Sequence, residues 1–303
     1  MNTVRLNAYA KLNLTLDVTG KEGEYHTLDS LVCSVNLFDR IVVKKRKDAL
    51  VNVTMRGMGS EEIPPEKNNA VKAAEAFVSR FRTQGADITV YKNIPIGAGL
   101  GGSSADAAGA LLGLSKLYKT EDFSALKEIA DRIGSDAGYM LTGGLARLTG
   151  RGTQAEFLGA FPRLHFLLLC PKEGVSAGQC YGAYDKAAQT NAPCTQAAVA
   201  ALKQNDLHAF GGLLKNDLYG AAASLCEGVK RALEEVKSFS PLGAAMTGSG
   251  SAVFALFETE ELCAWAKSRY RGKFRAYVVK TVTQPKKGAR SPFALSEEER
   301  EFN

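Results

Sequence analysis

The N-terminal half of the chain shows a strand pattern first and a helical pattern afterwards. Apolar and polar residues alternate through Thr3–Ala10 and Leu12–Val18, which predicts two half-buried strands. A polar loop over Gly20–His26 and two further β-rich runs follow. From Asn68 to Phe81 apolar residues recur at helical spacing, and Gly85 ends the segment, so we expect one amphipathic helix there.

The next elements come in the order strand, glycine-rich loop, helix. Residues Asp87–Tyr91 are typical of a strand, Asn93–Gly102 of a loop, and the apolar face of Ser103–Tyr118 predicts a helix. A second helix is expected over Phe123–Ile133, before the glycine-interrupted stretch Tyr139–Thr149 of mixed helix and strand. The loop therefore leads directly into the N-terminus of a helix.

The pattern restarts after Gly159, which indicates a second structural unit. A buried strand is predicted over Leu164–Cys170, and helices between Ser176 and Lys237. Three strands and one helix complete the expected order: Ala244–Thr247, Ala252–Phe257, the helix Glu260–Tyr270 and Ala276–Val282. At 303 residues the chain exceeds the size of most single cores. We therefore predict an α+β fold of two domains, 1–158 and 159–283, with a charged tail, 284–303.

Composition and charge describe an ordinary folded protein. Hydrophobic residues make up 45% and charged residues 23% of the chain, and no apolar run reaches membrane-spanning length. Segment 1–13 lacks the regions of a secretory signal, so a cytoplasmic location is expected. The net charge of +6 is spread along the sequence, and the basic cluster Lys44–Lys47 has no interleaved aromatic residues. We expect this cluster to be the solvated end of a strand, and neither a membrane nor nucleic acid as a partner.

The cysteines and histidines do not suggest a metal site. Six cysteines without a CxxC pair and only three histidines argue against bound zinc. Because Cys33, Cys170 and Cys226 lie in apolar stretches, we predict that they are reduced core residues.

The most informative segment is the glycine-rich loop Gly97–Ser104. Its four glycines let backbone amides approach an anion closely, and the following helix adds unpaired N–H groups and the positive end of its dipole. The loop also satisfies GxGxxG at Gly97, Gly99 and Gly102, but no strand-ending acidic residue follows, as a dinucleotide-binding fold requires. It lacks the Gly-Lys-Ser/Thr of a Walker A loop. We predict a phosphate site whose neutralising cation comes from elsewhere in the chain.

Three segments together resemble the GHMP small-molecule kinases. In the family's order they are Ala10–Leu14, Pro95–Ala108 and Met246–Ser251. The resemblance implies that 1–158 is a ribosomal protein S5 domain 2-like ATP-binding domain and that 159–283 is ferredoxin-like. It also implies phosphoryl transfer from ATP, with Mg²⁺, to a small alcohol. The chain is most similar to the branch of the family that phosphorylates a CDP-linked methylerythritol, on the residues Tyr25-His26, Asn68-Asn69, Gly134–Asp136, Thr142–Gly144, Gly150–Gly152 and Asn216–Leu218.

The resemblance implies roles that the individual residues would not suggest. Asp136 corresponds to the catalytic base and Lys11 to its cationic partner, whereas spacing alone favours a helix cap and a solvated lysine. The implied nucleotide contacts are Asn68 and Asn69 beside the adenine, and Pro95, Gly97, Gly99, Leu100, Gly101, Gly102, Ser103 and Ser104 around the phosphates, with Ser104 near the metal. The implied substrate contacts are Tyr25 and His26 at the cytosine end, together with Asn13, Tyr181, Gly248, Ser249 and Gly250. Taken alone, His26 would be a surface residue, Asn68 or Asn69 a helix cap, and Gly248–Gly250 a hairpin turn.

Some positions depart from the family's pattern, and rival functions stay open. Glu24 stands where glycine usually precedes the Tyr-His pair, and Ala137-Gly138 replace Val-Pro after Asp136. The rivals are a GHMP kinase for another alcohol of the mevalonate, homoserine or sugar type, a nucleotide-binding regulator without catalysis, and a nucleic-acid-binding protein. The expected assembly is a monomer or a homodimer.

Overall fold

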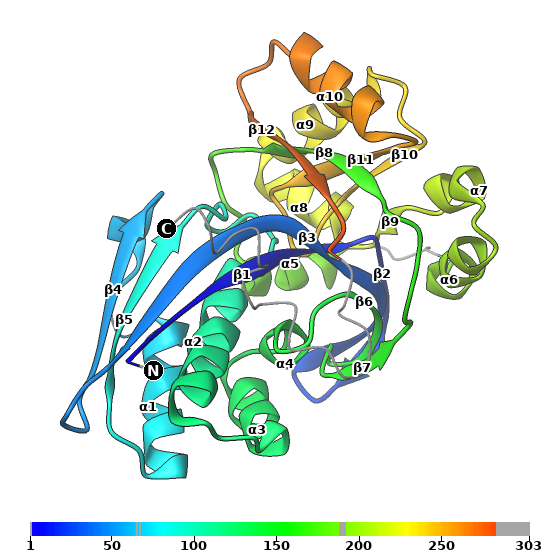
Figure 1. Ribbon diagram of the computed structural model, residues 1–303. Coiled ribbons are helices and arrows are strands. Elements are labelled where there is room, and N and C mark those ends of the chain that lie inside the picture. The colour runs from blue at the N-terminus through cyan, green and yellow to red at the C-terminus, as the bar shows by residue number, and fades with distance from the viewer. Residues whose placement is uncertain (1, 65, 67, 188–191, 283–303) are drawn as a thin grey trace.

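The chain folds into two β-sheets with helices packed on them (Figure 1). The computed structural model describes residues 2–64, 66, 68–187 and 192–282, so the expected tail 284–303 lies outside the described residues. The first sheet contains β1 (Thr3–Asn13), β2 (Thr15–Glu22), β3 (Tyr25–Lys45), β4 (Val51–Gly57), β5 (Ala86–Lys92), β6 (Leu145–Gly150), β7 (Gln154–Phe157) and β9 (Lys215–Asn216). A 3₁₀ turn, η1 (Ser60–Glu62), follows β4.

Strand β3 is the central strand of the first sheet. It is long enough to pair antiparallel with four strands, β1, β2, β5 and β6. The loop predicted over Gly20–His26 is wrong. Lys21 pairs with His26 and Glu22 with Tyr25, and the chain reverses at Gly23, whose φ is 62°. The segment looks like a loop because residues 19–25 of this hairpin are exposed and therefore mostly polar, whereas His26 is partly buried.

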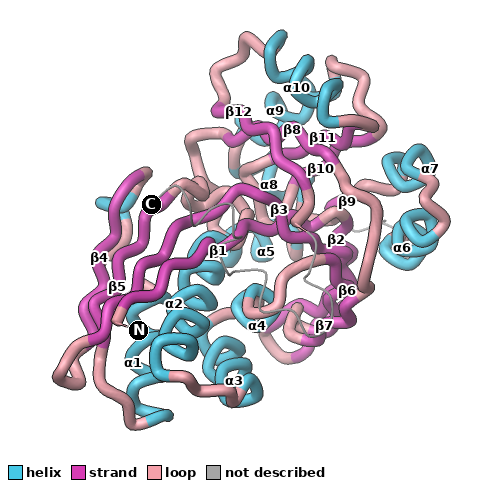
Figure 2. The backbone as a smooth tube through the Cα atoms, in the orientation of Figure 1, coloured by secondary structure: helices cyan, strands magenta, loops and turns pink. Residues whose placement is uncertain are grey.

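Helices α1 (Asn69–Phe81), α2 (Gly102–Tyr118), α3 (Phe123–Ile133) and α4 (Ala137–Met140) lie on one face of this sheet (Figures 1 and 2). Helix α2 packs closely against strand β3 because it carries glycines on its buried side. A methyl group on Gly109 would lie 2.3 Å from Ile41 Cδ1, and one on Gly113 would lie 2.5 Å from Val43 Cγ2. This close packing fixes the N-terminus of α2, and with it the end of the glycine-rich loop.

The second sheet is antiparallel, in the order β10 (Gly243–Met246), β11 (Val253–Phe257), β8 (His165–Cys170) and β12 (Arg275–Lys280). After His165, strand β8 is apolar and buried because both of its faces are covered. Leu167 and Leu169 pack with helices α9 (Glu227–Lys237) and α10 (Glu260–Arg269), whereas Phe166 and Leu168 join the core of the first unit. The predicted α+β class is confirmed.

The segment between the sheets crosses back to the first unit. Helices α5 (Ala177–Tyr184), α6 (Thr195–Lys203), α7 (Leu207–Gly212) and α8 (Tyr219–Leu225) occur here, and β9 pairs parallel with β2. Helix α6 also contacts β2 and β3. The domain boundary at 158 stays a prediction, because part of the second stretch completes the first sheet.

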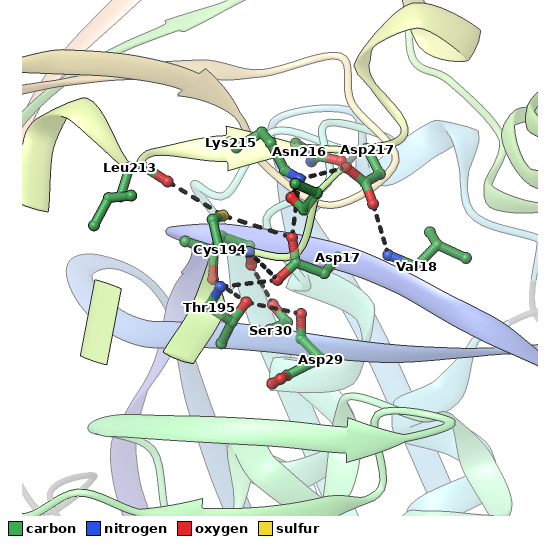
Figure 3. A network of polar contacts seen from close by, with 12 residues as sticks. Asp17, Val18, Asp29, Ser30, Cys194, Thr195, Leu213, Lys215, Asn216 and Asp217 are labelled. Atoms are coloured by element: carbon green, nitrogen blue, oxygen red, sulfur yellow. Dashed lines mark hydrogen bonds and ion pairs between the residues drawn. The ribbon is translucent and has the colours of Figure 1, made fainter. Parts of the chain in front are cut away.

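A buried polar network holds this crossing in place (Figure 3). Asp17 on β2 accepts hydrogen bonds from the N–H groups of Cys194 (2.9 Å) and Thr195 (2.8 Å) at the start of α6. Its other oxygen lies 3.1 Å from Lys215 Nζ, which also reaches Asp217 at 3.0 Å. Burial by itself raises the pKa of Asp17, but the hydrogen bonds from Thr195, Cys194 and Lys215 outweigh it, so the pKa is lowered.

The six cysteines are free thiols, and Cys33, Cys170 and Cys226 are buried as expected. Burial raises the pKa of Cys33 and Cys170, which keeps these thiols protonated. Within the described part of the chain, no helix is both long enough and apolar enough to cross a membrane.

Replacing Asp17 by alanine should lower the free energy of unfolding by about 2–4 kcal/mol, because the first N–H groups of α6 and Lys215 lose a buried acceptor. Urea denaturation measures the change, with the exposed Glu258→Ala as the control variant. Since the pKa of Asp17 is lowered, its contribution is present above the ordinary value of 3.8 and is lost as the pH falls below it. Equal denaturation midpoints for the Asp17 variant and the unchanged chain would contradict this role.

Candidate active site

Two cavities meet at the glycine-rich loop. The larger, about 630 Å³, is lined by Lys11 and Asp136, by the aromatic residues near His26, and by the turn at Gly248. The smaller, about 360 Å³, is lined by Asn68, Asn69 and the loop itself. Gly99, Gly101 and Ser104 line both cavities. The two cavities therefore adjoin at this loop.

The loop conformation depends on glycine. Gly97, Gly99 and Gly101 have φ values of 66°, 74° and 71°, in the left-handed region that other residues rarely adopt. Gly101 precedes the first residue of α2 and caps it without a side chain, so the helix N-terminus faces the loop. The dipole and the free N–H groups there favour an anion.

The three sequence segments far apart in the chain come together at this loop. A methyl group on Gly99 would lie 2.2 Å from the Thr247 carbonyl oxygen, and one on Gly248 would lie 2.8 Å from the Gly99 carbonyl oxygen. The N–H of Lys11 donates to the Leu100 carbonyl at 3.0 Å. The predicted hairpin turn does occur at 248–250, between β10 and β11, but it packs against the loop and so also shapes the cavity.

Lys11 and Asp136 face each other beside the loop. Lys11 Nζ lies 3.4 Å from Asp136 Oδ2 and also donates to the side-chain oxygen of Asn13. The amide of Asn13 is held in turn by donation to Ser30 Oγ at 2.8 Å. Lys11 is almost fully buried, whereas the Asp136 side chain is 32% exposed toward the cavity it lines. Lys11 is therefore not a solvated strand lysine.

Asp136 precedes the short helix α4, but its side chain makes no capping hydrogen bond, so the carboxylate is not used as a helix cap. Ala137 and Gly138 form α4 without the proline usual in the family. A methyl group on Gly138 would lie 2.1 Å from Asp131 Oδ1 on α3, so the close approach of these two helices depends on the missing side chain.

A second cluster in the larger cavity is aromatic. The ring of His26 on β3 stacks on Tyr181 of α5, with centroids 4.6 Å apart and planes 22° from parallel. His26 Nε2 lies 2.7 Å from Asp185 Oδ1, and Lys21 Nζ donates to the other oxygen of Asp185 at 2.6 Å. These two hydrogen bonds lower the pKa of Asp185. The His26 side chain is only 8% exposed, so it is not a surface histidine.

Sequence reasoning missed Asp185 and gave no role to Arg151. Asp185 caps the C-terminus of α5 four residues after Tyr181, and this spacing was the available signal. Arg151 comes from the turn between β6 and β7, and its guanidinium carbon lies 3.5 Å from the centre of the Tyr25 ring. Both residues line the larger cavity, and so does Glu24.

The smaller cavity is lined by two asparagines and by a buried cluster of charged side chains. Asn68 accepts the N–H of Ala70 at 3.0 Å, so it does cap α1, and both Asn68 and Asn69 line the cavity. Lys92 is buried between Asp39 and Asp106 and forms ion pairs with both. Burial raises the pKa of Asp106 to about 8. Lys92 is thus engaged with two acidic side chains at the smaller cavity, whereas Lys11, paired with Asp136, lies beside the shared loop at the larger cavity.

Asn216 holds the turn that packs on the loop. Its side-chain nitrogen donates to the carbonyl oxygens of Met246 (2.9 Å) and Gly248 (2.8 Å), and its oxygen accepts the N–H of Leu218 at 2.9 Å. In the sequence, Asn216 stood out only through the resemblance to the GHMP kinases. The buried network around Lys215 and Asp217 fixes its neighbours on β9 (Figure 3).

Two family models match the chain: the GHMP kinases N terminal domain over residues 68–146, and the GHMP kinases C terminal domain over residues 198–270. The 4-diphosphocytidyl-2-C-methyl-D-erythritol kinase of Desulfitobacterium hafniense is 38% identical over 86% of this chain and 89% of its own. The enzyme of that name from Caldicellulosiruptor saccharolyticus is 36% identical, with coverages of 83% and 87%.

Solved structures agree with these matches. A crystal structure of 4-(cytidine 5'-diphospho)-2C-methyl-D-erythritol kinase superposes with a TM-score of 0.75 at 30% identity, over 91% of this chain and 98% of that one. Homoserine kinase from Cytophaga hutchinsonii has a TM-score of 0.71 at 18% identity, over 94% and 96%, and shares the fold. The fold and the shared loop thus define the class, a GHMP kinase. Within that class the chain belongs to the family of 4-diphosphocytidyl-2-C-methyl-D-erythritol kinases.

Gly99→Ala should weaken binding of a non-hydrolysable ATP analogue by about tenfold or more, because alanine is strained at φ 74° and its methyl group meets the Thr247 carbonyl. Isothermal titration calorimetry measures the affinity. Gly220→Ala is the matched control, since a methyl group there has nothing within 4 Å. An unchanged dissociation constant for the Gly99 variant would place the phosphates elsewhere.

Proposed function

We propose that this chain transfers the γ-phosphoryl group of ATP to a hydroxyl of 4-diphosphocytidyl-2-C-methyl-D-erythritol, a step of the non-mevalonate isoprenoid precursor pathway. The observation that carries the proposal is the position of Lys11 and Asp136. They lie where the two cavities meet, beside the loop that both cavities share. A nucleotide in the smaller cavity and an alcohol in the larger one would meet at these two side chains.

The geometry supports a direct transfer. Asp136 is exposed to the larger cavity and is not used as a cap, so it can accept the proton of the substrate hydroxyl. Lys11 is held by Asn13 and by its own backbone at the loop, which places its charge where the attacking oxygen becomes negative. The loop N–H groups and the N-terminus of α2 hold the phosphates during transfer.

Mg²⁺ is expected with the ATP, and the oxygen donors present fit it. Mg²⁺ binds through one or two protein oxygens and substrate phosphates rather than in an all-protein cage. The Ser104 hydroxyl and the Asp136 carboxylate line the larger cavity, and no described residues form a cluster of three or more His, Cys, Asp or Glu able to hold a metal. When bound, the ion neutralises charge on the transferring phosphoryl group.

The larger cavity favours a nucleotide-linked alcohol over a small one. The His26, Tyr181 and Asp185 cluster offers an aromatic face and hydrogen-bonding groups, as a base requires. Mevalonate or homoserine would leave this cluster without a contact. ATP consumption should therefore rise with 4-diphosphocytidyl-2-C-methyl-D-erythritol and stay at background with mevalonate, homoserine or sugars. Turnover of one of those alcohols instead would reassign the substrate, and no turnover at all would favour a regulator.

Asp136→Asn should lower kcat by about 10² to 10⁴ while leaving ATP affinity largely intact, because the variant keeps the shape of the site but loses the proton acceptor. Steady-state kinetics and a separate ATP-binding measurement check the two parts. Glu121→Gln, an exposed carboxylate before α3, should behave as the unchanged chain. Near-normal turnover of the Asp136 variant would remove it from this role.

His26→Ala should raise KM for the cytidylyl substrate by about 10- to 100-fold, since a stacked ring and a hydrogen-bonding group are lost together. KM for ATP should not change, because His26 lines only the larger of the two cavities described. Kinetics with each substrate varied in turn gives both constants. Equal increases in both would show a general loss of structure instead.

A further inference from the structure

The turn between β6 and β7 presents an arginine to the larger cavity. Gly150 and Gly152 flank Arg151 with φ values of 62° and 83°, and the N–H of Gly152 donates to the Thr149 carbonyl at 3.1 Å. Left-handed backbone on both sides of Arg151 makes this a tight, defined turn. Arg151 is exposed, yet it lines the cavity together with Gly152.

Arg151 is held by an aromatic ring rather than by a carboxylate. Its guanidinium carbon lies 3.5 Å from the centre of the Tyr25 ring. Among the described residues it forms no ion pair and no hydrogen bond. A guanidinium stacked on a ring keeps its N–H edge available, and that planar edge matches the oxygens of a phosphate.

The turn lies between the two functional clusters of the cavity. On one side, a methyl group on Gly152 would lie 3.9 Å from Ser135 Cβ, and Ser135 directly precedes Asp136. On the other side, the partner ring belongs to Tyr25, which directly precedes His26. Arg151 therefore lies between Asp136 and the aromatic cluster around His26.

Away from the glycine-rich loop, the charged side chains that line the larger cavity favour an anion at Arg151. Its carboxylates are Glu24, Asp136 and Asp185. Lys11 is engaged with Asp136, while Lys21 and His26 are engaged with Asp185. A multiply charged linker crossing this cavity would meet repulsion from the carboxylates unless a free cation compensated it. Among the charged residues lining the cavity, Arg151 is that cation.

We propose that Arg151 binds the diphosphate that joins the cytidine to the methylerythritol in the substrate, with Tyr25 holding the guanidinium in place. The inference rests on the proposed function, since it needs a substrate with a diphosphate linker. The linker then lies beside the Arg151 turn, with the base toward His26 and the acceptor hydroxyl toward Asp136. Two N–H groups of one guanidinium can bind two phosphate oxygens side by side.

Arg151→Ala should raise KM for the CDP-linked substrate by about 10- to 100-fold and leave KM for ATP unchanged, because charge-assisted hydrogen bonds are lost only from the larger cavity. Arg151→Lys should recover part of the loss, since it keeps the charge without the planar fork. Arg80→Ala, on the outer side of α1, is the control and should match the unchanged chain. Thermal melting confirms that the variants are folded.

Inhibition by cytidine and by CDP separates the linker from the base. The unchanged chain should bind CDP more tightly than cytidine, and Arg151→Ala should reduce that preference about tenfold or more while cytidine binding stays the same. Turnover by the unchanged chain with an unaltered CDP preference in the Ala variant would overturn this inference but not the proposed function. No turnover by the unchanged chain would overturn the proposed function, and the inference with it.

Discussion

The structure depends on a contact in which backbone packs directly on backbone. The loop around Gly99 and the turn around Gly248 approach so closely that no side chain fits between them. The loop belongs to the first unit, and the turn joins two strands of the second sheet. The proposed phosphate site is therefore assembled by the packing of two units, and Lys11 joins it through a hydrogen bond to the Leu100 carbonyl. The site exists only where the whole fold is in place.

Much of the fold could be predicted from the sequence because the relevant signals are local. The helix over 69–81 and the strand, loop and helix over 86–118 follow from apolar periodicity and from glycine. The Gly20–His26 hairpin was missed because an exposed strand is as polar as a loop. Strand β9 has two residues, too short for any periodicity, and it is joined to β2 by the ion pair between its own Lys215 and Asp17, which is distant in the sequence.

The candidate site was predictable as a set of segments but not as a set of contacts. Glycine content identifies the loop, yet nothing local indicates that Lys11 will be buried beside Asp136. That burial is tolerated because Asn13 and the carboxylate compensate the charge. Three other polar residues of the site also give no local signal in the sequence. Asp185, Arg151 and Asn216 are ordinary polar residues in the sequence, and their positions become meaningful only through partners on other elements.

Strand β3 has a further consequence for the ligand. His26 lies near its beginning, and Ser34, eight positions later, is the register partner of Lys11 on β1. His26 thus lies on β3, and Lys11 lies on the strand that pairs with it, so backbone hydrogen bonds of one sheet hold the two ends of the larger cavity at a set separation. For the proposed reaction this separation selects the acceptor: a hydroxyl one bond nearer to the cytosine, or one bond farther from it, would not lie at Asp136.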